Sequence, residues 1–183
     1  DRLSELIENL LDTYKLKSGN VRMNPKETRV EDFFQSVLDR LKAQETNLEI
    51  TLKVQPSDLK VYADSRRLAQ VINNLINNAS KYAPDSNVEI IAKEQDDKIL
   101  IEFSDDGPGI PEEHLDKLFN RFYRVPDRSG GVRGSGLGLY ICKQILEAHQ
   151  GKIWVESVVD QGTTFYILLD RLGKIEEDEE LNE

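Results

Sequence analysis

The sequence has little of several residue types and lacks some familiar segments. Its 183 residues contain a single cysteine, Cys142, so the chain has no internal disulfide and suits a reducing compartment. No apolar run approaches the ~20 residues that a membrane-spanning helix needs. No signal-peptide pattern opens the chain. Lys and Arg number 24 against 34 Asp and Glu, and the net charge of -10 argues against a general nucleic-acid binder.

Two common nucleotide-binding signatures are also missing. The sequence contains no G-x-x-x-x-G-K-[ST], which excludes a P-loop. Its glycine-rich stretch at 134–139 lacks the G-x-G-x-x-G spacing and follows no predicted strand directly, so a dinucleotide-binding fold is disfavoured.

The apolar periodicity predicts helices and strands that do not alternate strictly, which favours an α+β fold. Helices are expected over 1–17, after a Thr28–Glu31 capping box, from an Asp64 cap to Tyr82, from Pro111 to Leu118, and from Leu137 to Gln150. Strands are expected over 21–27, 48–54, 59–63, 87–94, 98–104, 152–158 and 163–169.

The helix expected over 64–82 carries an unusual concentration of asparagine. Its apolar residues share one side at helical spacing, while Asn74, Asn78 and Lys81 fall on the other. Asparagine is a mediocre helix former, yet its amide oxygen suits Mg²⁺ and its NH2 group can donate to a phosphate. Taken alone, a solvated polar face explains this pattern equally well.

Two glycine segments follow. The strand expected over 98–104 runs into Asp105-Asp106-Gly107-Pro108-Gly109, where a carboxylate could accept a hydrogen bond from the exocyclic amine of adenine. By itself, a turn at a strand end is the commoner explanation. The stretch 134–139 enters a helix, and free backbone amides at a helix start attract phosphates more readily than a plain linker would. Basic residues precede it: Lys117, Arg121, Arg124, Arg128 and Arg133.

Together these stretches resemble the catalytic and ATP-binding domain of sensor histidine kinases, in the superfamily shared with gyrase, Hsp90 and MutL. The matching order is Q-V-I-N-N-L-I-N-N-A-S-K-Y, then D-D-G-P-G-I, L-F-N-R-F-Y-R-V and G-S-G-L-G-L, and the resemblance covers roughly 21–170. It implies a Bergerat ATP-binding fold, a two-layer sandwich in which helices cover one face of a mixed sheet and ATP lies between the helices and a lid.

The resemblance also implies roles for individual residues. Asn78 is expected to hold Mg²⁺, with Asn74 near the ion or the phosphates, and Asp106 is expected to bind the adenine amine. Catalytic roles fall to Asn74, Lys81 and Arg124, the last at the terminal phosphate. The remaining residues expected around ATP are Tyr82, Gly109, Ile110, Gly134, Ser135, Gly136, Leu137, Gly138, Leu139 and Thr163.

The implied organisation has three parts. Residues 1–20 are expected to be the end of a dimerisation helix, 21–173 the catalytic domain and 174–183 an acidic, disordered tail, all cut from a longer protein. Expected partners are ATP, a histidine-bearing dimerisation domain in a homodimer, and a response-regulator receiver domain. Contact of this fragment with nucleic acid or a membrane is not expected. The resemblance implies a cytoplasmic location, either of a cytoplasmic kinase or of the cytoplasmic portion of a membrane-anchored sensor.

The implied activity is transfer of the γ-phosphoryl group of ATP to a histidine outside this chain. The hydrolytic branches of the superfamily carry a glutamate where this chain has Asn74, and an amide is no general base. Neither His114 nor His149 lies in a sequence like H-E-L-R-T-P, so self-phosphorylation is not expected. A non-catalytic ATP-binding docking module and an ATPase with an unrecognised base remain as alternatives.

Overall fold

The computed structural model describes residues 23–42, 48–126 and 134–171. The helix expected over 1–17 and the tail from 174 lie outside these residues. The elements, in chain order, are β1 (Lys26–Arg29), α2 (Val30–Lys42), β2 (Glu49–Gln55), β3 (Lys60–Ala63), α3 (Ser65–Tyr82), β4 (Asn87–Gln95), β5 (Lys98–Asp105), α4 (Glu112–Leu115), α5 (Gly138–Ala148), β6 (Lys152–Val158) and β7 (Gly162–Asp170).

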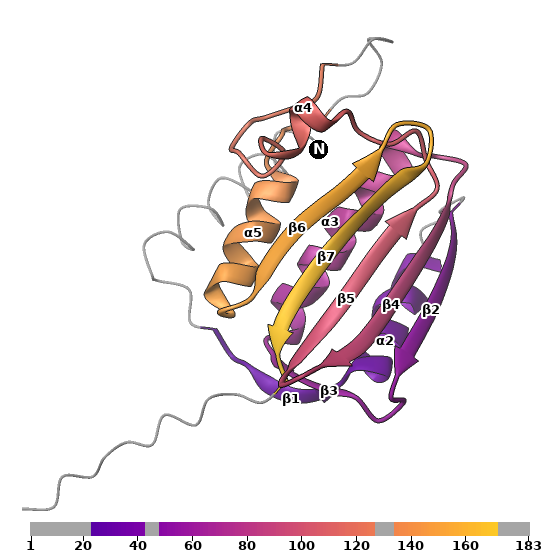
Figure 1. The fold of residues 1–183 in the computed structure, drawn as a ribbon. Coiled ribbons are helices and arrows are strands. Elements are labelled where there is room, and N and C mark those ends of the chain that lie inside the picture. Colours follow the sequence, from indigo (N-terminus) through magenta and orange to yellow (C-terminus); the bar gives the residue numbers. More distant parts are fainter. Residues whose placement is uncertain (1–22, 43–47, 127–133, 172–183) are drawn as a thin grey trace, which may run out of the picture.

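Five strands form one mixed sheet in the order β2-β4-β5-β7-β6. β2 runs parallel to β4, and all the other neighbours are antiparallel. β1 and β3 pair separately as a two-stranded ribbon. Figure 1 shows α2, α3 and α5 against one face of the large sheet, with the opposite face open. The expected α+β fold, a mixed sheet with helices on one face, is confirmed.

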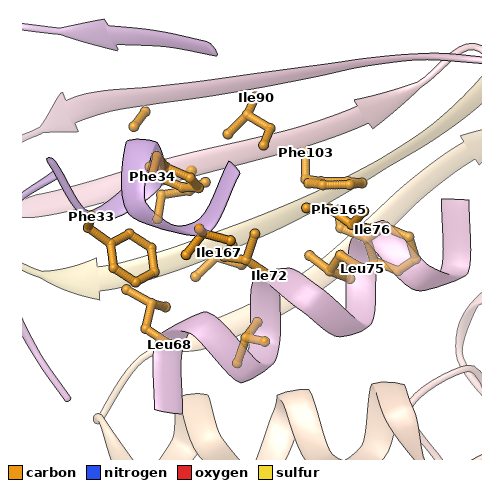
Figure 2. Packing of buried hydrophobic residues seen from close by; sticks show 14 of the residues in the cluster. Phe33, Phe34, Leu68, Ile72, Leu75, Ile76, Ile90, Phe103, Phe165 and Ile167 are labelled. Carbon is orange, nitrogen blue, oxygen red and sulfur yellow. The ribbon is translucent and has the colours of Figure 1, made fainter. Parts of the chain in front are cut away.

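The core lies between this sheet and its helices. Along β5, Ile99, Ile101 and Phe103 are buried at every second position, as a strand with one face on the core requires. Figure 2 shows the apolar side of α3, with Leu68, Ile72, Leu75 and Ile76, packed toward Phe103 and Phe165 of the strands. This packing leaves the polar side of α3 pointing away from the core.

The start of α3 is fixed by its predicted cap. The Asp64 carboxylate accepts hydrogen bonds from the backbone N–H groups of Arg66 and Arg67, each at 3.1 Å, and from that of Asn24 at 3.1 Å. Burial works against ionisation of Asp64, but these three amides outweigh it and hold the pKa of the carboxyl below its ordinary value. The cap therefore joins α3 to the segment before β1.

Asp64→Ala should lower the free energy of unfolding by about 1–2 kcal/mol, the usual cost of losing an N-cap. Because the pKa of Asp64 is lowered in the folded chain, its contribution is present above the ordinary carboxyl value and is lost as pH falls through the lowered one. Urea unfolding at several pH values measures both effects. Asp85→Ala, at an exposed position beyond the other end of α3, is the control; equal losses in the two variants would contradict the capping role.

Three local predictions need correction. Thr28 lies in β1 with its hydroxyl 3.2 Å from that of Ser65, and α2 begins at Val30, so the predicted capping box does not form. Of the strand expected over 21–27, residues 21–22 lie outside the described part of the chain, 23–25 are not in a strand, and β1 covers Lys26–Arg29. The helix expected from Pro111 to Leu118 is reduced to Glu112–Leu115. Among the described helices, none has the length and apolar character needed to cross a bilayer.

Candidate nucleotide-binding site

The polar side of α3 divides its asparagines into two pairs. Asn73 and Asn77 are exposed to solvent, whereas Asn74 and Asn78 are half-buried, one turn apart. Within the described part of the chain, the Asn78 amide has no hydrogen-bond partner, although it is partly withdrawn from water. A half-buried amide without an internal partner is suited to an external ligand.

Asn74 faces the first turn of α5. Its amide nitrogen donates to the carbonyl oxygen of Gly138 at 3.4 Å, and a Cβ on Gly138 would lie 3.7 Å from the Asn74 amide oxygen. Cys142, one turn further along α5, lies 3.8 Å from the carbonyl oxygen of Val71. Burial raises the pKa of the Cys142 thiol to about 12 despite a hydrogen bond from Asn74, so this cysteine stays protonated and unreactive. Asn74 thus fixes α5 beside α3.

The start of α5 has the features of an anion site. Its N-cap residue, Leu137, makes no side-chain cap, and among the described residues no side chain accepts a hydrogen bond from the N–H groups of Gly138, Leu139 or Tyr140. Ser135 accepts a hydrogen bond from the Leu137 N–H at 3.3 Å. Gly136 has φ +68, and a Cβ there would lie 2.7–2.9 Å from the Phe122 backbone, so only glycine fits.

The two ends of the segment between α4 and α5 meet at this point. The Phe122 N–H donates to the Gly136 carbonyl oxygen at 2.9 Å, and Phe122 itself has φ +64. Tyr82 is exposed, and its hydroxyl would lie 3.3 Å from a Cβ on Gly134. Lys81 and Arg124 are both exposed, on the last turn of α3 and just beyond Phe122. Asn74 and Tyr82, near the two ends of 74–82, therefore lie beside Gly138 and Gly134, respectively.

Asp105 and Asp106 point to opposite faces of the sheet. Asp105 continues the alternation of Ile101 and Phe103, so its side chain lies on the side that α3 covers. The Asp106 carboxylate lies on the other side, where it accepts hydrogen bonds from the backbone N–H of Asn87 at 2.6 Å and from its side-chain amide at 2.8 Å. These bonds lower the pKa of the exposed Asp106. The structure thus brings Asp105, and not Asp106, to the side of the asparagine helix.

The pKa of Asp105 is shifted in the opposite direction to that of Asp106. Burial raises its pKa above the ordinary value and the negative charge of Asp106 adds to this, while hydrogen bonds from the N–H groups of Gly107 and Thr163 lower it by less. The Gly107 N–H lies 3.0 Å from the carboxylate. Thr163 is buried and pairs with Asp105 across β5 and β7. A partly buried carboxylate beside a buried hydroxyl is typical of a binding site.

The glycine turn after Asp105 packs against the hairpin that joins β6 to β7. A Cβ on Gly109, at φ +67, would overlap the carbonyl oxygen of Val158. The Ile110 N–H donates to the Ser157 hydroxyl at 2.8 Å. A Cβ on Gly107 would overlap that of Ala83, just after α3. The pocket corner around Asp105 therefore adjoins the end of α3, roughly 13 Å along the helix axis from Asn74.

A groove opens mainly on the uncovered face at the same end of the sheet. Its volume is about 450 Å³. Asn87, Glu89, Asp106 and Glu156 line it in part, and at the end of the sheet it also reaches Asp105, Ser157 and Thr163. The described residues that line it include carboxylates but no lysine or arginine, so it repels anions. The start of α5 lies instead on the helical side, beside Asn74 of α3 (Figure 1).

Sequence reasoning missed Asp105 and Ser157. The signal for Asp105 was in the sequence, because the apolar residues at 99, 101 and 103 predict that 105, and not 106, faces the helices. Ser157 had no local signal, because its partner Ile110 is 47 residues away.

Comparisons with known proteins agree with this arrangement. The family model for "Histidine kinase-, DNA gyrase B-, and HSP90-like ATPase" matches residues 63–172. Sensor histidine kinase WalK of Bacillus subtilis is 33% identical over 97% of this chain, and adaptive-response sensory kinase SasA of Synechococcus elongatus is 35% identical over 91%. The chain spans 30% and 44%, respectively, of the length of these relatives.

Solved structures give the same result. The catalytic domain of histidine kinase ThkA, nucleotide-free, superposes with a TM-score of 0.68 at 30% identity, covering 81% of this chain and 97% of that one. Full-length ShkA in complex with AMPPNP gives a TM-score of 0.79 at 25% identity, covering 92% of this chain and 36% of that one. Its relatives WalK and ThkA are histidine kinases, and SasA is a sensory kinase. This chain belongs to the histidine kinase-, DNA gyrase B- and HSP90-like ATPase family.

Proposed function

We propose that this chain is the ATP-binding catalytic domain of a sensor histidine kinase. The observation that carries the proposal is the pairing of two recognition elements on the helical side of one sheet. At one end, the uncapped start of α5 lies beside Asn74. At the other, the partly buried Asp105 lies beside Thr163. The first suits phosphates and the second suits a base that carries hydrogen-bond donors.

Within this site we assign adenine recognition to Asp105 with Thr163, in place of the Asp106 that the sequence first suggested. Gly109 and Ile110 hold the turn beside the base. The phosphates lie against the stretch 134–139, with Lys81 and Arg124 supplying positive charge and Tyr82 packing near the nucleotide.

A magnesium ion fits the donor set. Among the described residues no group of three or more His, Cys, Asp or Glu could hold a metal, so an ion in this site would depend on an amide oxygen and on the nucleotide's own phosphates, as Mg²⁺ commonly does. Asn78, whose amide has no partner within the described residues, is the residue that would hold it. When bound, the ion neutralises charge on the phosphates.

The reaction that this site supports is transfer of the terminal phosphoryl group to a histidine. A neutral imidazole is already a nucleophile, so positioning and charge neutralisation suffice. Asn74 offers no general base for activating water, which disfavours hydrolysis.

Both histidines of this chain are engaged elsewhere. His149 Nε2 accepts from the Asp64 N–H at 3.0 Å while its Nδ1 lies 2.8 Å from the Ile145 carbonyl oxygen. His114 Nδ1 lies 2.8 Å from the Tyr123 hydroxyl. The acceptor histidine therefore belongs to another segment.

The partners follow from that reaction. A histidine-bearing dimerisation domain, in a homodimer of the full kinase, receives the phosphoryl group, and a response-regulator receiver domain takes it next. A solved structure of ThkA in complex with its response regulator TrrA supports the second partner. We retain 1–20, 21–173 and 174–183 as the proposed division of the chain, and a cytoplasmic site of action.

Asn78→Ala should weaken binding of Mg²⁺–ATP by about tenfold or more, because the ion loses its protein ligand. The neighbouring Asn77→Ala, at an exposed position of the same helix, is the matched control and should leave the affinity unchanged. Calorimetry with and without Mg²⁺ measures both. Equal affinities for the wild type and Asn78→Ala, or an Asn77→Ala variant equally weakened, would remove Asn78 from the metal site.

A further inference from the structure

Ser157, near the end of β6, connects two other segments at the base-recognition corner, the turn at Ile110 and the start of β7. Its hydroxyl oxygen lies 2.8 Å from the carbonyl oxygen of Gly162, 2.8 Å from the backbone nitrogen of Ile110 and 2.9 Å from the hydroxyl oxygen of Thr163. The hairpin around it is held by a further bond, from the Asp160 N–H to the Pro108 carbonyl oxygen at 2.9 Å. These hydrogen bonds hold Ser157 beside Thr163.

The direction of each of these hydrogen bonds follows from counting hydrogens. A serine hydroxyl has one hydrogen and two lone pairs. The Gly162 carbonyl oxygen can only accept, so the Ser157 hydrogen points to it. The Ile110 N–H can only donate, so it takes one lone pair of Ser157. The remaining lone pair faces Thr163, and the Thr163 hydroxyl must therefore donate to Ser157.

This arrangement fixes what Thr163 can offer to a ligand. With its only hydrogen directed at Ser157, the Thr163 oxygen presents lone pairs alone. Asp105, its cross-strand partner, is acceptor-only when ionised. The corner therefore presents hydrogen-bond acceptors from both side chains, which matches an exocyclic amine and opposes a carbonyl oxygen at the same position of the base.

We propose that Ser157 is a positioning residue that makes this corner select a 6-amino purine over a 6-oxo purine. It does so by accepting the hydrogen bond that the Thr163 hydroxyl donates, so that Thr163 has no hydrogen left to donate to the base. The inference rests on the proposed function and extends it from ATP binding to the residue that sets base selectivity. Without Ser157, the Thr163 hydroxyl can rotate and donate to a 6-oxo group, so discrimination falls.

The test compares ATP with inosine triphosphate, which carries an oxygen in place of the 6-amino group, on the 183-residue chain. Ser157→Ala should lower the ratio of ATP to inosine triphosphate affinity by roughly tenfold, about the size of one net hydrogen bond. Ser104→Ala is the matched control, because the Ser104 and Thr164 hydroxyls lie 3.0 Å apart across the same strands but on the uncovered face. It should keep the wild-type ratio.

Two substitutions at Thr163 test the same base selectivity independently of Ser157. Thr163→Val removes the hydroxyl and should reduce the ratio as Ser157→Ala does, whereas Thr163→Ser keeps the hydroxyl and should preserve it. Thermal melting identifies any variant that fails to fold. If Ser157→Ala fails to fold, the affinity ratios of Thr163→Val and Thr163→Ser test the inference in its place.

The outcomes separate the two proposals. A wild-type chain that binds neither nucleotide overturns the proposed function, and the inference with it. A wild type that prefers ATP, with Ser157→Ala keeping the same ratio, overturns the inference alone. Equal loss of affinity for both nucleotides in Ser157→Ala also overturns it, because that result shows a structural role without selectivity.

Discussion

Asp105→Asn should weaken ATP binding while making the folded chain more stable near neutral pH. The binding loss should be about 10- to 100-fold, because a hydrogen bond to a charged group contributes roughly 1.5–3 kcal/mol. The gain in stability has a separate cause: burial of the ionised Asp105 side chain destabilises the folded state, and an uncharged amide removes that cost.

The pH dependence of this gain has a definite sign. The pKa of Asp105 is raised in the folded chain, so its favourable contribution to stability is present below the ordinary carboxyl value of 3.8 and is lost as pH rises through the raised value. Asp105→Asn should therefore exceed the wild type in free energy of unfolding at pH 7, and the difference should shrink on acidification. Urea unfolding across this pH range measures the trend.

Asp106→Asn is the control for both measurements. Its carboxylate faces Asn87 on the uncovered face, and its pKa is lowered, so its removal should bring no gain in stability and no change in ATP affinity. An Asp106→Asn variant that loses adenine recognition, beside an Asp105→Asn variant that keeps it, would contradict the assignment and restore Asp106 as the base-binding residue.

Gly162→Ala should destabilise the fold more than the loss of the Asp64 cap does. Gly162 has φ +106, which an L side chain rarely adopts, and a Cβ there would overlap the carbonyl oxygen of Asp105. Backbone strain and overpacking together should lower the free energy of unfolding by about 2–4 kcal/mol. To relieve the overlap with the Asp105 carbonyl oxygen, the start of β7 would have to shift away from β5. This shift would move Thr163 away from Asp105, so ATP affinity should fall in the molecules that remain folded.

Denaturant titration measures the first effect. Gly134→Ala is the control, because the nearest atom to its Cβ would be the Tyr82 hydroxyl at 3.3 Å, the end of a flexible and exposed side chain. A Gly162→Ala variant that unfolds at the wild-type urea concentration would show that the hairpin can move away from β5 without loss.

The parts of the fold that the sequence predicted are those determined by local chemistry. Asp64 could be recognised as a cap because its side chain bonds amides two and three residues ahead. The face of α3 that carries Asn74 and Asn78 followed from helical spacing alone. The strands near residues 87–105 followed from alternating apolar residues.

Long-range pairing decided what the sequence could not predict. Thr28 joins a strand because β3, far along the chain, pairs with it, and this pairing outweighs the local capping pattern. Asn74 contacts Gly138 across 64 residues, and Ser157 contacts Ile110 across 47. The residues that position the proposed ligand-binding groups therefore could not be predicted from the sequence, even where those binding groups could.

The most direct test of the account is phosphoryl transfer. The chain is incubated with γ-labelled ATP, Mg²⁺ and a separately purified dimerisation domain that carries the acceptor histidine. We expect acid-labile, base-stable label on that domain, none on this chain, and a loss of transfer with Asn78→Ala but not with Asn77→Ala. Steady release of phosphate without transfer, or acid-stable label on a hydroxyl residue, would contradict the assignment of this site to a histidine kinase.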